Sequence, residues 1–254
     1  MKLIQNGLLR RLADGAVSLL YPPVCPICDE TLPLGRNGRL CDRCEGKMKP
    51  IVQPACLKCG KQLMSHVQEY CEQCSKRGFH FKRGFAIFNY EDEARDLILK
   101  LKYNGRKDIA EYFANCAVEL YGDILKATGA DAVIPVPIHK KRLIKRGYNQ
   151  AQAVARIIAD KLNLICIEDL LVRTKQTEAQ KELSGMERLV NLYDAFEVDL
   201  YFLQQYKKRM TLEKVILVDD IFTTGSTIEC CSIILQKYGV KEVYFISVAA
   251  TQNL

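Results

Sequence analysis

The stretch that decides the fold of this chain is Val215-Ile-Leu-Val-Asp219-Asp220-Ile-Phe-Thr223-Thr224-Gly225-Ser226-Thr227. Its first four residues are apolar and β-prone, which predicts a short buried strand that ends at two adjacent carboxylates. A turn rich in hydroxyl groups follows, and a helix is expected over 227–238, before Gly239. Strand, polar turn and helix in this order are typical of an α/β domain, which binds its ligand at the carboxyl end of a parallel sheet.

The turn itself is suited to a phosphate group. Free backbone N–H groups and the helix dipole attract an anion to the start of a helix. Gly225 lets the backbone come close to a ligand. Four hydroxyl groups are available as further donors, on Thr223, Thr224, Ser226 and Thr227.

The two carboxylates, Asp219 and Asp220, would repel a phosphate, and they suit sugar hydroxyl groups, Mg²⁺, or both. A ligand with a phosphate at one end and two neighbouring hydroxyl groups is a ribose 5-phosphate. The alternative is an ordinary capped helix, which accounts for one hydroxyl group but not for two carboxylates and four hydroxyls. A Walker-type phosphate loop is excluded because G-x-x-x-x-G-K-[ST] is absent.

The remainder of the C-terminal two thirds alternates strand-like and helix-like patterns. This alternation predicts an α/β domain over 85–254 with a parallel sheet flanked by helices. Further strands are expected at 85–90, 132–136, 164–172 and 243–250, and further helices at 91–101, 151–162 and 184–192.

The N-terminal third is organised by cysteine. Eight of the twelve cysteines form four C-x-x-C pairs: Cys25/Cys28, Cys41/Cys44, Cys56/Cys59 and Cys71/Cys74. Each pair can present two sulfurs to one metal ion, and two pairs complete the tetrahedral shell that Zn²⁺ prefers. We therefore expect two structural Zn²⁺ ions in a small unit over 23–80. Spacing alone does not decide which pairs share a metal, although sequential pairing is favoured over interleaved pairing.

The chain has a net charge of +7, and the whole excess lies in residues 1–84, which hold 14 Lys and Arg against 7 Asp and Glu. This charge permits contact with nucleic acid but does not require it. Residues 1–22 are expected to form a short amphipathic helix. Because Arg10, Arg11 and Asp14 interrupt any signal-like apolar run, and no stretch is long enough to span a membrane, we expect a cytoplasmic protein.

A second polar segment follows the strand expected at 132–136. Five cations fall within seven residues, and a cluster this dense favours a nearby anion over a solvated loop. The five cations are Lys140, Lys141, Arg142, Lys145 and Arg146, and His139 directly precedes them as a sixth candidate for this site. Two weaker candidates for phosphate contact are the cationic turn 101–106 and the polar segment 173–191.

The Asp-Asp turn resembles the phosphoribosyl pyrophosphate (PRPP) motif of type I phosphoribosyltransferases. The resemblance implies that Asp219 and Asp220 bind the ribose hydroxyl groups and that Thr223 to Thr227 hold the 5-phosphate, with Mg²⁺ bound alongside PRPP. It also implies that residues 138–142 grip the pyrophosphate and that 173–191 is a loop that closes over the substrate.

The motifs of this chain, and the order in which they occur, resemble those of the ComF family over nearly the whole chain. These motifs are the four C-x-x-C pairs, Leu-Lys-Tyr-x-Gly-Arg at 101–106, Pro-Val-Pro at 135–137, Arg-Gly-Tyr-Asn-Gln at 146–150 and the Asp-Asp turn. The family implies a type I phosphoribosyltransferase fold, a double zinc ribbon, and a part in handling single-stranded DNA during natural transformation. Ile-Phe at 221–222 departs from the Val-Thr more usual in the family, which concerns the shape of the turn.

Two hypotheses about function stay open at this point. The first is an enzyme that transfers a phosphoribosyl group from PRPP, with acceptor and catalytic residues unassigned. The second is a non-catalytic module that binds nucleotides or single-stranded DNA, together with other competence proteins.

Overall fold

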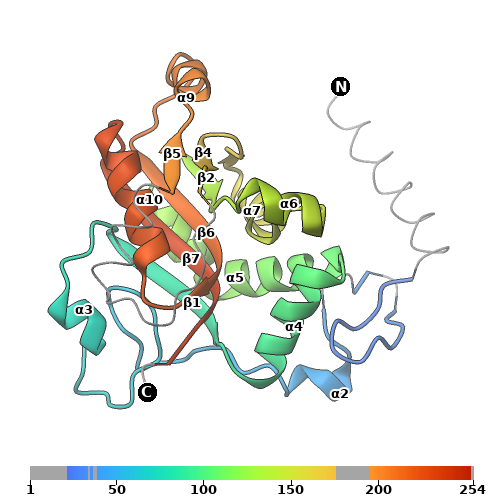
Figure 1. Cartoon of the computed structure of the whole chain (residues 1–254). Coiled ribbons are helices and arrows are strands. Elements are labelled where there is room, and N and C mark those ends of the chain that lie inside the picture. Colours follow the sequence, from blue (N-terminus) through green and yellow to red (C-terminus); the bar gives the residue numbers. More distant parts are fainter. Residues whose placement is uncertain (1–21, 34, 37–38, 176–194, 253–254) are drawn as a thin grey trace, which may run out of the picture.

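A computed structural model describes residues 22–33, 35–36, 39–175 and 195–252. Its centre is a five-stranded sheet in the order β1-β7-β6-β2-β3, in which every neighbouring pair is parallel (Figure 1). The strands are β1 (Arg83–Asn89), β2 (Ala132–Pro135), β3 (Ile165–Cys166), β6 (Lys214–Phe222) and β7 (Glu242–Ala250). The α/β fold with a parallel sheet that the sequence predicts is confirmed.

The two faces of the sheet are covered by different helices, because alternate residues of each strand point to opposite sides. Helices α4 (Asp92–Tyr103), α5 (Lys107–Ala127) and α7 (Gln150–Leu162) share a core with Ile216 and Val218. Helix α10 (Ser226–Lys237) shares the other core with Val215 and Leu217. All four of these β6 side chains are at most 1% exposed.

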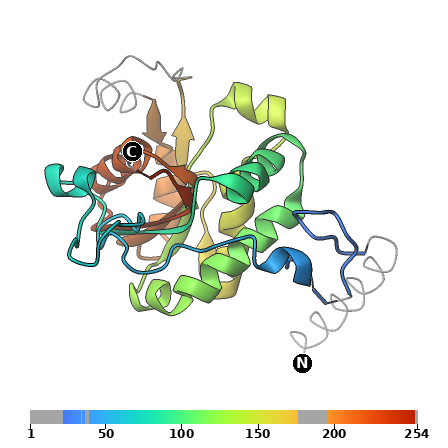
Figure 2. The ribbon, with the colours of Figure 1, turned by 90° about the horizontal axis from the view of Figure 1, so that it is seen from below.

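Each pair of C-x-x-C turns packs on a different face of this sheet. The segment around α2 (Asp42–Glu45) belongs to the core of α4 and α5, through Cys25, Leu32 and Met48. The segment around α3 (Glu72–Lys76) belongs to the core of α10, through Leu63. Figures 1 and 2 show the two segments on opposite sides of the sheet.

The connection between these segments runs along the edge strand β1. Pro50 forms an antiparallel bridge with Phe88, and the Ile51 N–H donates to the carbonyl oxygen of Ile87 at 2.7 Å. The chain therefore passes from one face of the sheet to the other around the β1 edge. The cysteine-rich N-terminal third and the α/β domain that follows are built on shared cores.

Besides elements that the sequence did not predict, such as helix α5, the structure differs from the expected elements in three places. The strand expected over 164–172 is divided into β3 and β4 (Leu171–Arg173), and β4 pairs antiparallel with β5 (Phe196–Val198) in a separate sheet. The division falls at the polar pair Glu168 and Asp169, whose side chains accept hydrogen bonds from α7 and from Tyr206.

The second difference is that β6 continues through both aspartates, because β7 extends alongside it and pairs Asp219 with Ser247. The third is that the basic segment is a helix, α6 (Lys140–Arg146), rather than a loop. Helix α9 (Leu200–Lys207) completes the described helices. The helices expected at 1–22 and 184–192, and most of the segment 173–191, lie outside the described residues.

Within the described ranges, no helix combines the length and apolar character that a membrane crossing requires.

Gly84 provides a test of how tightly β1 packs on the sheet. A Cβ atom at Gly84 would lie 2.0 Å from the ring of Phe245, which is fully buried and stacks on Phe222 at 4.8 Å. Gly84→Ala should therefore lower the free energy of unfolding by about 1–3 kcal/mol, because the added methyl group would displace the ring of Phe245, which is packed tightly on all sides.

Gly78→Ala is the matched control, because nothing lies within 4 Å of its Cβ position. Chemical denaturation of both variants measures the difference. Equal stability of the two variants would contradict the packing described.

Candidate functional site

The acid pair lies at the carboxyl end of the central strand β6. The backbone N–H of Asp220 donates to Oδ1 of Asp219 at 2.8 Å. Lys102, in the last turn of α4, places its Nζ 3.0 Å from Oδ2 of Asp220, and the two side chains are only 14% and 20% exposed. The carboxylates are therefore held side by side, and one of them is already paired with a cation.

The environment of Asp219 opposes its ionisation. Burial, and then the neighbouring charge of Asp220, raise the pKa of Asp219 from 3.8 to about 7. The hydrogen bond from the Asp220 backbone and the charges of Lys102 and Arg173 act in the opposite direction on this pKa. A ligand that donates hydrogen bonds or brings a cation to Asp219 would relieve this cost.

The turn after β6 leads directly into α10. Gly225 has φ of 79°, and a Cβ there would lie 2.9 Å from the ring of Phe222, so only glycine fits without strain. The hydroxyl oxygens of Thr224 and Ser226 lie 3.0 Å apart. Because the residue at the N-cap is Gly225, no side chain at that position caps the helix. The capped-helix alternative therefore does not account for these hydroxyl groups.

Arg173 supplies positive charge near the acid pair, and Arg142 supplies positive charge near Arg173. Arg173, at the end of β4, is half-buried with its guanidinium 5.0 Å from the ring centre of Phe196. Burial, and then the charge of Arg142, lower the pKa of Arg173, while the charge of Asp219 raises it. Arg142, Arg173 and Asp219 therefore interact electrostatically across three separate elements of the fold.

The basic segment is anchored at the same edge of the sheet as the acid pair. The N–H of Val136 donates to the carbonyl of Val218 at 2.8 Å, and Asn149 Nδ2 donates to the carbonyl of Val136 at 2.9 Å. Between them lies α6, whose N-cap His139 accepts a hydrogen bond from the Lys141 N–H at 3.2 Å.

The cations of α6 do not all face the acid pair. Lys140, Lys141 and Lys145 are exposed. Arg146 donates to Gln150 at 3.1 Å and stacks over the ring of Tyr103 at 5.2 Å. Among the predicted cations, Arg142 is the one whose charge acts on Arg173, which in turn interacts with Asp219.

The eight cysteines form two separate clusters. Sequential pairs come together, as Cys25, Cys28, Cys41 and Cys44 in one cluster and Cys56, Cys59, Cys71 and Cys74 in the other. In both clusters the third cysteine is the N-cap of a short helix that carries the fourth. His66 lies outside both clusters, and His80 pairs instead with Glu229 of α10 at 2.5 Å.

The geometry of both clusters fits a tetrahedral zinc ion. All four sulfurs of each cluster lie within 4.8 Å of one another. The separation is 3.6 Å for Cys28 and Cys41, and 3.7 Å for Cys59 and Cys71. Four sulfurs at ~2.3 Å from a zinc ion stand about 3.8 Å apart. Four cysteines leave no coordination position open, so these are structural zinc sites.

The fold and the two sites define a class: an α/β protein with a parallel sheet and an N-terminal double zinc ribbon. The Double zinc ribbon domain family matches residues 16–75. The chain is 31% identical to competence protein F of Haemophilus influenzae over 222 residues, which are 86% of this chain and 93% of that protein.

Two other relatives align over most of the chain. DNA utilization protein YhgH of Escherichia coli K12 is 26% identical and covers 89% of this chain and 96% of its own length. Competence protein ComFC of Streptococcus pneumoniae is 25% identical over 80% of this chain and 84% of its own length. The chain belongs to the ComF family, as its motifs indicate.

Sequence reasoning assigned one turn of the site incompletely. The cationic turn 101–106 was a weak candidate for phosphate contact, but Lys102 pairs with Asp220 while Arg106 pairs with Asp29 and Asp108. The sequence signal was the density of cations in this turn. Which cation faces which partner depends on the rotation of α4, which no local pattern reveals.

The raised pKa of Asp219 predicts a pH-dependent gain in stability for Asp219→Asn. Between pH ~4 and ~7 the folded state keeps a proton that the unfolded state has released, so the ionisable side chain makes the fold less stable as pH rises. Asparagine removes this penalty. The melting temperature should rise more at pH 8 than at pH 5.

Asp123→Asn, on the exposed side of α5, removes the same charge and serves as the control. A gain for Asp219→Asn that is no larger at pH 8 than at pH 5 would contradict the environment described for this carboxyl.

The two clusters predict two zinc ions per chain in protein purified without added metal. Cys28→Ser should reduce the content to one, because three sulfurs hold the first ion weakly. Cys116 lies outside both clusters, so Cys116→Ser should leave the content at two zinc ions per chain. Elemental analysis measures the content, and iron in place of zinc, or no loss in Cys28→Ser, would contradict the assignment.

Proposed function

We propose that the acid pair and the turn that follows bind the ribose 5-phosphate part of PRPP together with Mg²⁺. One observation carries the proposal: β6 delivers Asp219 and Asp220 to the same edge of the sheet at which an uncapped helix start and the hydroxyl-rich turn converge. Carboxylates that accept from sugar hydroxyls and amides that donate to a phosphate match the two ends of this ligand.

Each part of the site has a role in the proposed complex. Asp219 and Asp220 accept hydrogen bonds from the ribose hydroxyl groups, and Thr223, Thr224, Ser226 and Thr227 surround the 5-phosphate. Residues 138–142, at the start of the basic segment, receive the pyrophosphate. Mg²⁺, when bound with PRPP, neutralises charge on the pyrophosphate.

Transfer of the phosphoribosyl group is the reaction that this arrangement supports. The bond from ribose C1 to pyrophosphate breaks as an acceptor attacks C1. The chain contributes by stabilising negative charge on the leaving pyrophosphate, and we propose Arg142 and Arg173 for this role. We assign no catalytic acid or base.

The cellular role that we propose follows from the relatives. Two of them are named competence proteins and one is named a DNA utilization protein. We propose that this chain acts in DNA uptake during natural transformation, alongside other competence proteins.

A second candidate function is binding of single-stranded DNA at α6. The observation that favours it is the exposure of Lys140, Lys141 and Lys145, next to Arg146 stacked on Tyr103, which is 62% exposed. Cations beside an accessible aromatic ring are suited to a phosphate backbone and an unpaired base.

Thermal unfolding with ligand tests the first proposal. A ligand at 100 times its Kd stabilises the folded state by ~2.7 kcal/mol, so PRPP with Mg²⁺ should raise the melting temperature measurably. The double variant Asp219→Asn, Asp220→Asn should lose this shift. Asp123→Asn with Asp160→Asn removes the same charge from exposed positions of α5 and α7 and should keep it.

The same assay with a single-stranded oligonucleotide separates the two candidates. Binding through phosphate contacts weakens by ~0.7 log units per contacted phosphate for each log unit of salt. No shift with millimolar PRPP, combined with a salt-dependent shift with DNA that is lost in Lys140→Ala, Lys141→Ala, Lys145→Ala, would replace the first proposal with the second.

A further inference from the structure

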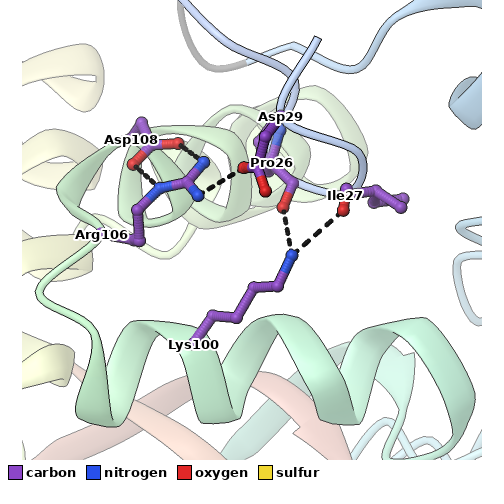
Figure 3. Close-up of polar contacts among 6 residues, drawn as sticks. All are labelled: Pro26, Ile27, Asp29, Lys100, Arg106 and Asp108. Carbon is purple, nitrogen blue, oxygen red and sulfur yellow. Dashed lines mark hydrogen bonds and ion pairs between the residues drawn. The ribbon is translucent and has the colours of Figure 1, made fainter.

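The end of α4 connects the first zinc cluster to the acid pair. Three cations lie within residues 100–106, and they reach in two directions. Lys100 and Arg106 contact the turn that carries Cys25 and Cys28 (Figure 3). Lys102 contacts Asp220.

Lys100 binds the backbone of the zinc-binding turn. Its Nζ donates to the carbonyl oxygens of Ile27 at 3.0 Å and Pro26 at 3.4 Å. Both carbonyls lie between Cys25 and Cys28, and the turn is closed by the Asp29 N–H, which donates to the Cys25 carbonyl at 2.9 Å. The contact of Lys100 therefore depends on the closed form of this turn, because both carbonyl oxygens point to one ammonium group only when the turn is closed.

Arg106 joins the same turn to the start of α5. Its Nη1 donates to Asp29 Oδ1 at 2.5 Å, while Nε and Nη2 form a two-pronged contact with Asp108 at 2.9 and 2.7 Å. The guanidinium is only 24% exposed. Figure 3 shows it lying between the two carboxylates. Two-pronged contacts fix the orientation of a guanidinium, so Arg106 ties the α4–α5 turn to the zinc-binding turn.

Lys102 lies on the other side of the same helical turn. Residues two apart on a helix are rotated by about 200°, so Lys100 and Lys102 point in opposite directions. Leu101 between them is fully buried, and its carbonyl accepts a hydrogen bond from the Tyr148 hydroxyl group. A rotation or shift of this turn would therefore move Lys102 away from Asp220.

We propose that Arg106 is a positioning residue that, with the first zinc-binding turn, holds Lys102 against Asp220 and so prepares the acid pair for an anionic ligand. The inference rests on the proposed function, because the ligand is the ribose phosphate assigned to that site. Lys102 offsets one of two adjacent negative charges, which would otherwise repel the phosphate and pyrophosphate groups. Metal binding at the first cluster is thereby linked to the acid pair through one turn of α4.

A double-mutant cycle with PRPP and Mg²⁺ tests the route of the effect. Arg106→Gln should weaken binding about tenfold by calorimetry, equivalent to a loss of about 1.4 kcal/mol. Lys102→Met should weaken it at least as much. The variant that carries both changes should bind no more weakly than Lys102→Met alone, because Arg106 acts through Lys102. Additive losses would overturn the inference.

Arg39→Gln is the matched control. Arg39 joins the first ribbon to Glu119 of α5 through an exposed contact at 2.6 Å that does not involve the turn of Cys25 and Cys28. Its loss should leave PRPP affinity unchanged. An equal loss of affinity in Arg39→Gln and Arg106→Gln would mean that any contact between ribbon and helix matters, which would overturn a specific role for Arg106.

A second readout needs no ligand. Lys102 is 14% exposed, so a lysine-acylating reagent should label it slowly relative to the exposed Lys126, as measured by mass spectrometry. Labelling of Lys102 should become several times faster in Arg106→Gln and in Asp29→Asn, which keeps the size of the side chain, but not in Arg39→Gln.

The two readouts separate the failure of this inference from the failure of the proposed function. Absence of PRPP binding by the wild-type chain rejects the proposed function, and Lys102 labelling then decides the positioning role alone. Unchanged labelling in both Arg106→Gln and Asp29→Asn, with each variant folded by circular dichroism, overturns the inference.

Discussion

The structure depends on the packing of two metal-stapled segments against opposite faces of one parallel sheet. A parallel sheet must be covered on both faces, and a segment of about 25 residues cannot bury a core of its own. In this chain the two cysteine-rich segments help to cover the two faces of the sheet, and the sheet and its helices complete the cores of those segments. The linker around Ile51 follows the β1 edge, so that one ribbon joins the core of α4 and α5 and the other joins the core of α10. Zinc is expected to stabilise the whole chain, since its binding energy becomes folding energy.

The two carboxylates that are electrostatically unfavourable in the unliganded fold are the same two that we propose bind the ligand. Two adjacent carboxylates at a strand end repel each other, and burial raises the pKa of Asp219 further. Lys102 and Arg173 offset part of that cost from two different elements. Two adjacent carboxylates that repel each other are stabilised by hydroxyl donors and by a divalent cation. The site is therefore suited to a ligand that brings these together with phosphate groups. The first ribbon contacts Arg106, four residues after Lys102, which is why we propose that the ribbon contributes to the site as well as to the fold.

Much of this could be predicted from the sequence because the signals were local. The four C-x-x-C pairs predicted both zinc clusters, and the apolar run before Asp219 predicted the central strand, although not its continuation beside β7. The division of 164–172 and the helix at 140–146 were not predicted. The division depends on contacts with other segments of the chain, such as that of Asp169 with Tyr206. The pairing of Lys102 with Asp220 joins residues far apart in sequence, so the local spacing of residues does not predict it.

A crystal structure of the zinc-loaded chain grown with Mg²⁺ and PRPP would show whether the two zinc-binding segments and the acid pair act as described. We predict anomalous scattering from one zinc ion in each four-cysteine cluster, on opposite faces of the sheet. We also predict the 5-phosphate at Thr223–Thr227 and the ribose hydroxyl groups on Asp219 and Asp220. A ligand bound elsewhere, on the ribbons or along α6, with the acid pair still occupied only by Lys102, would contradict the assignment of this site.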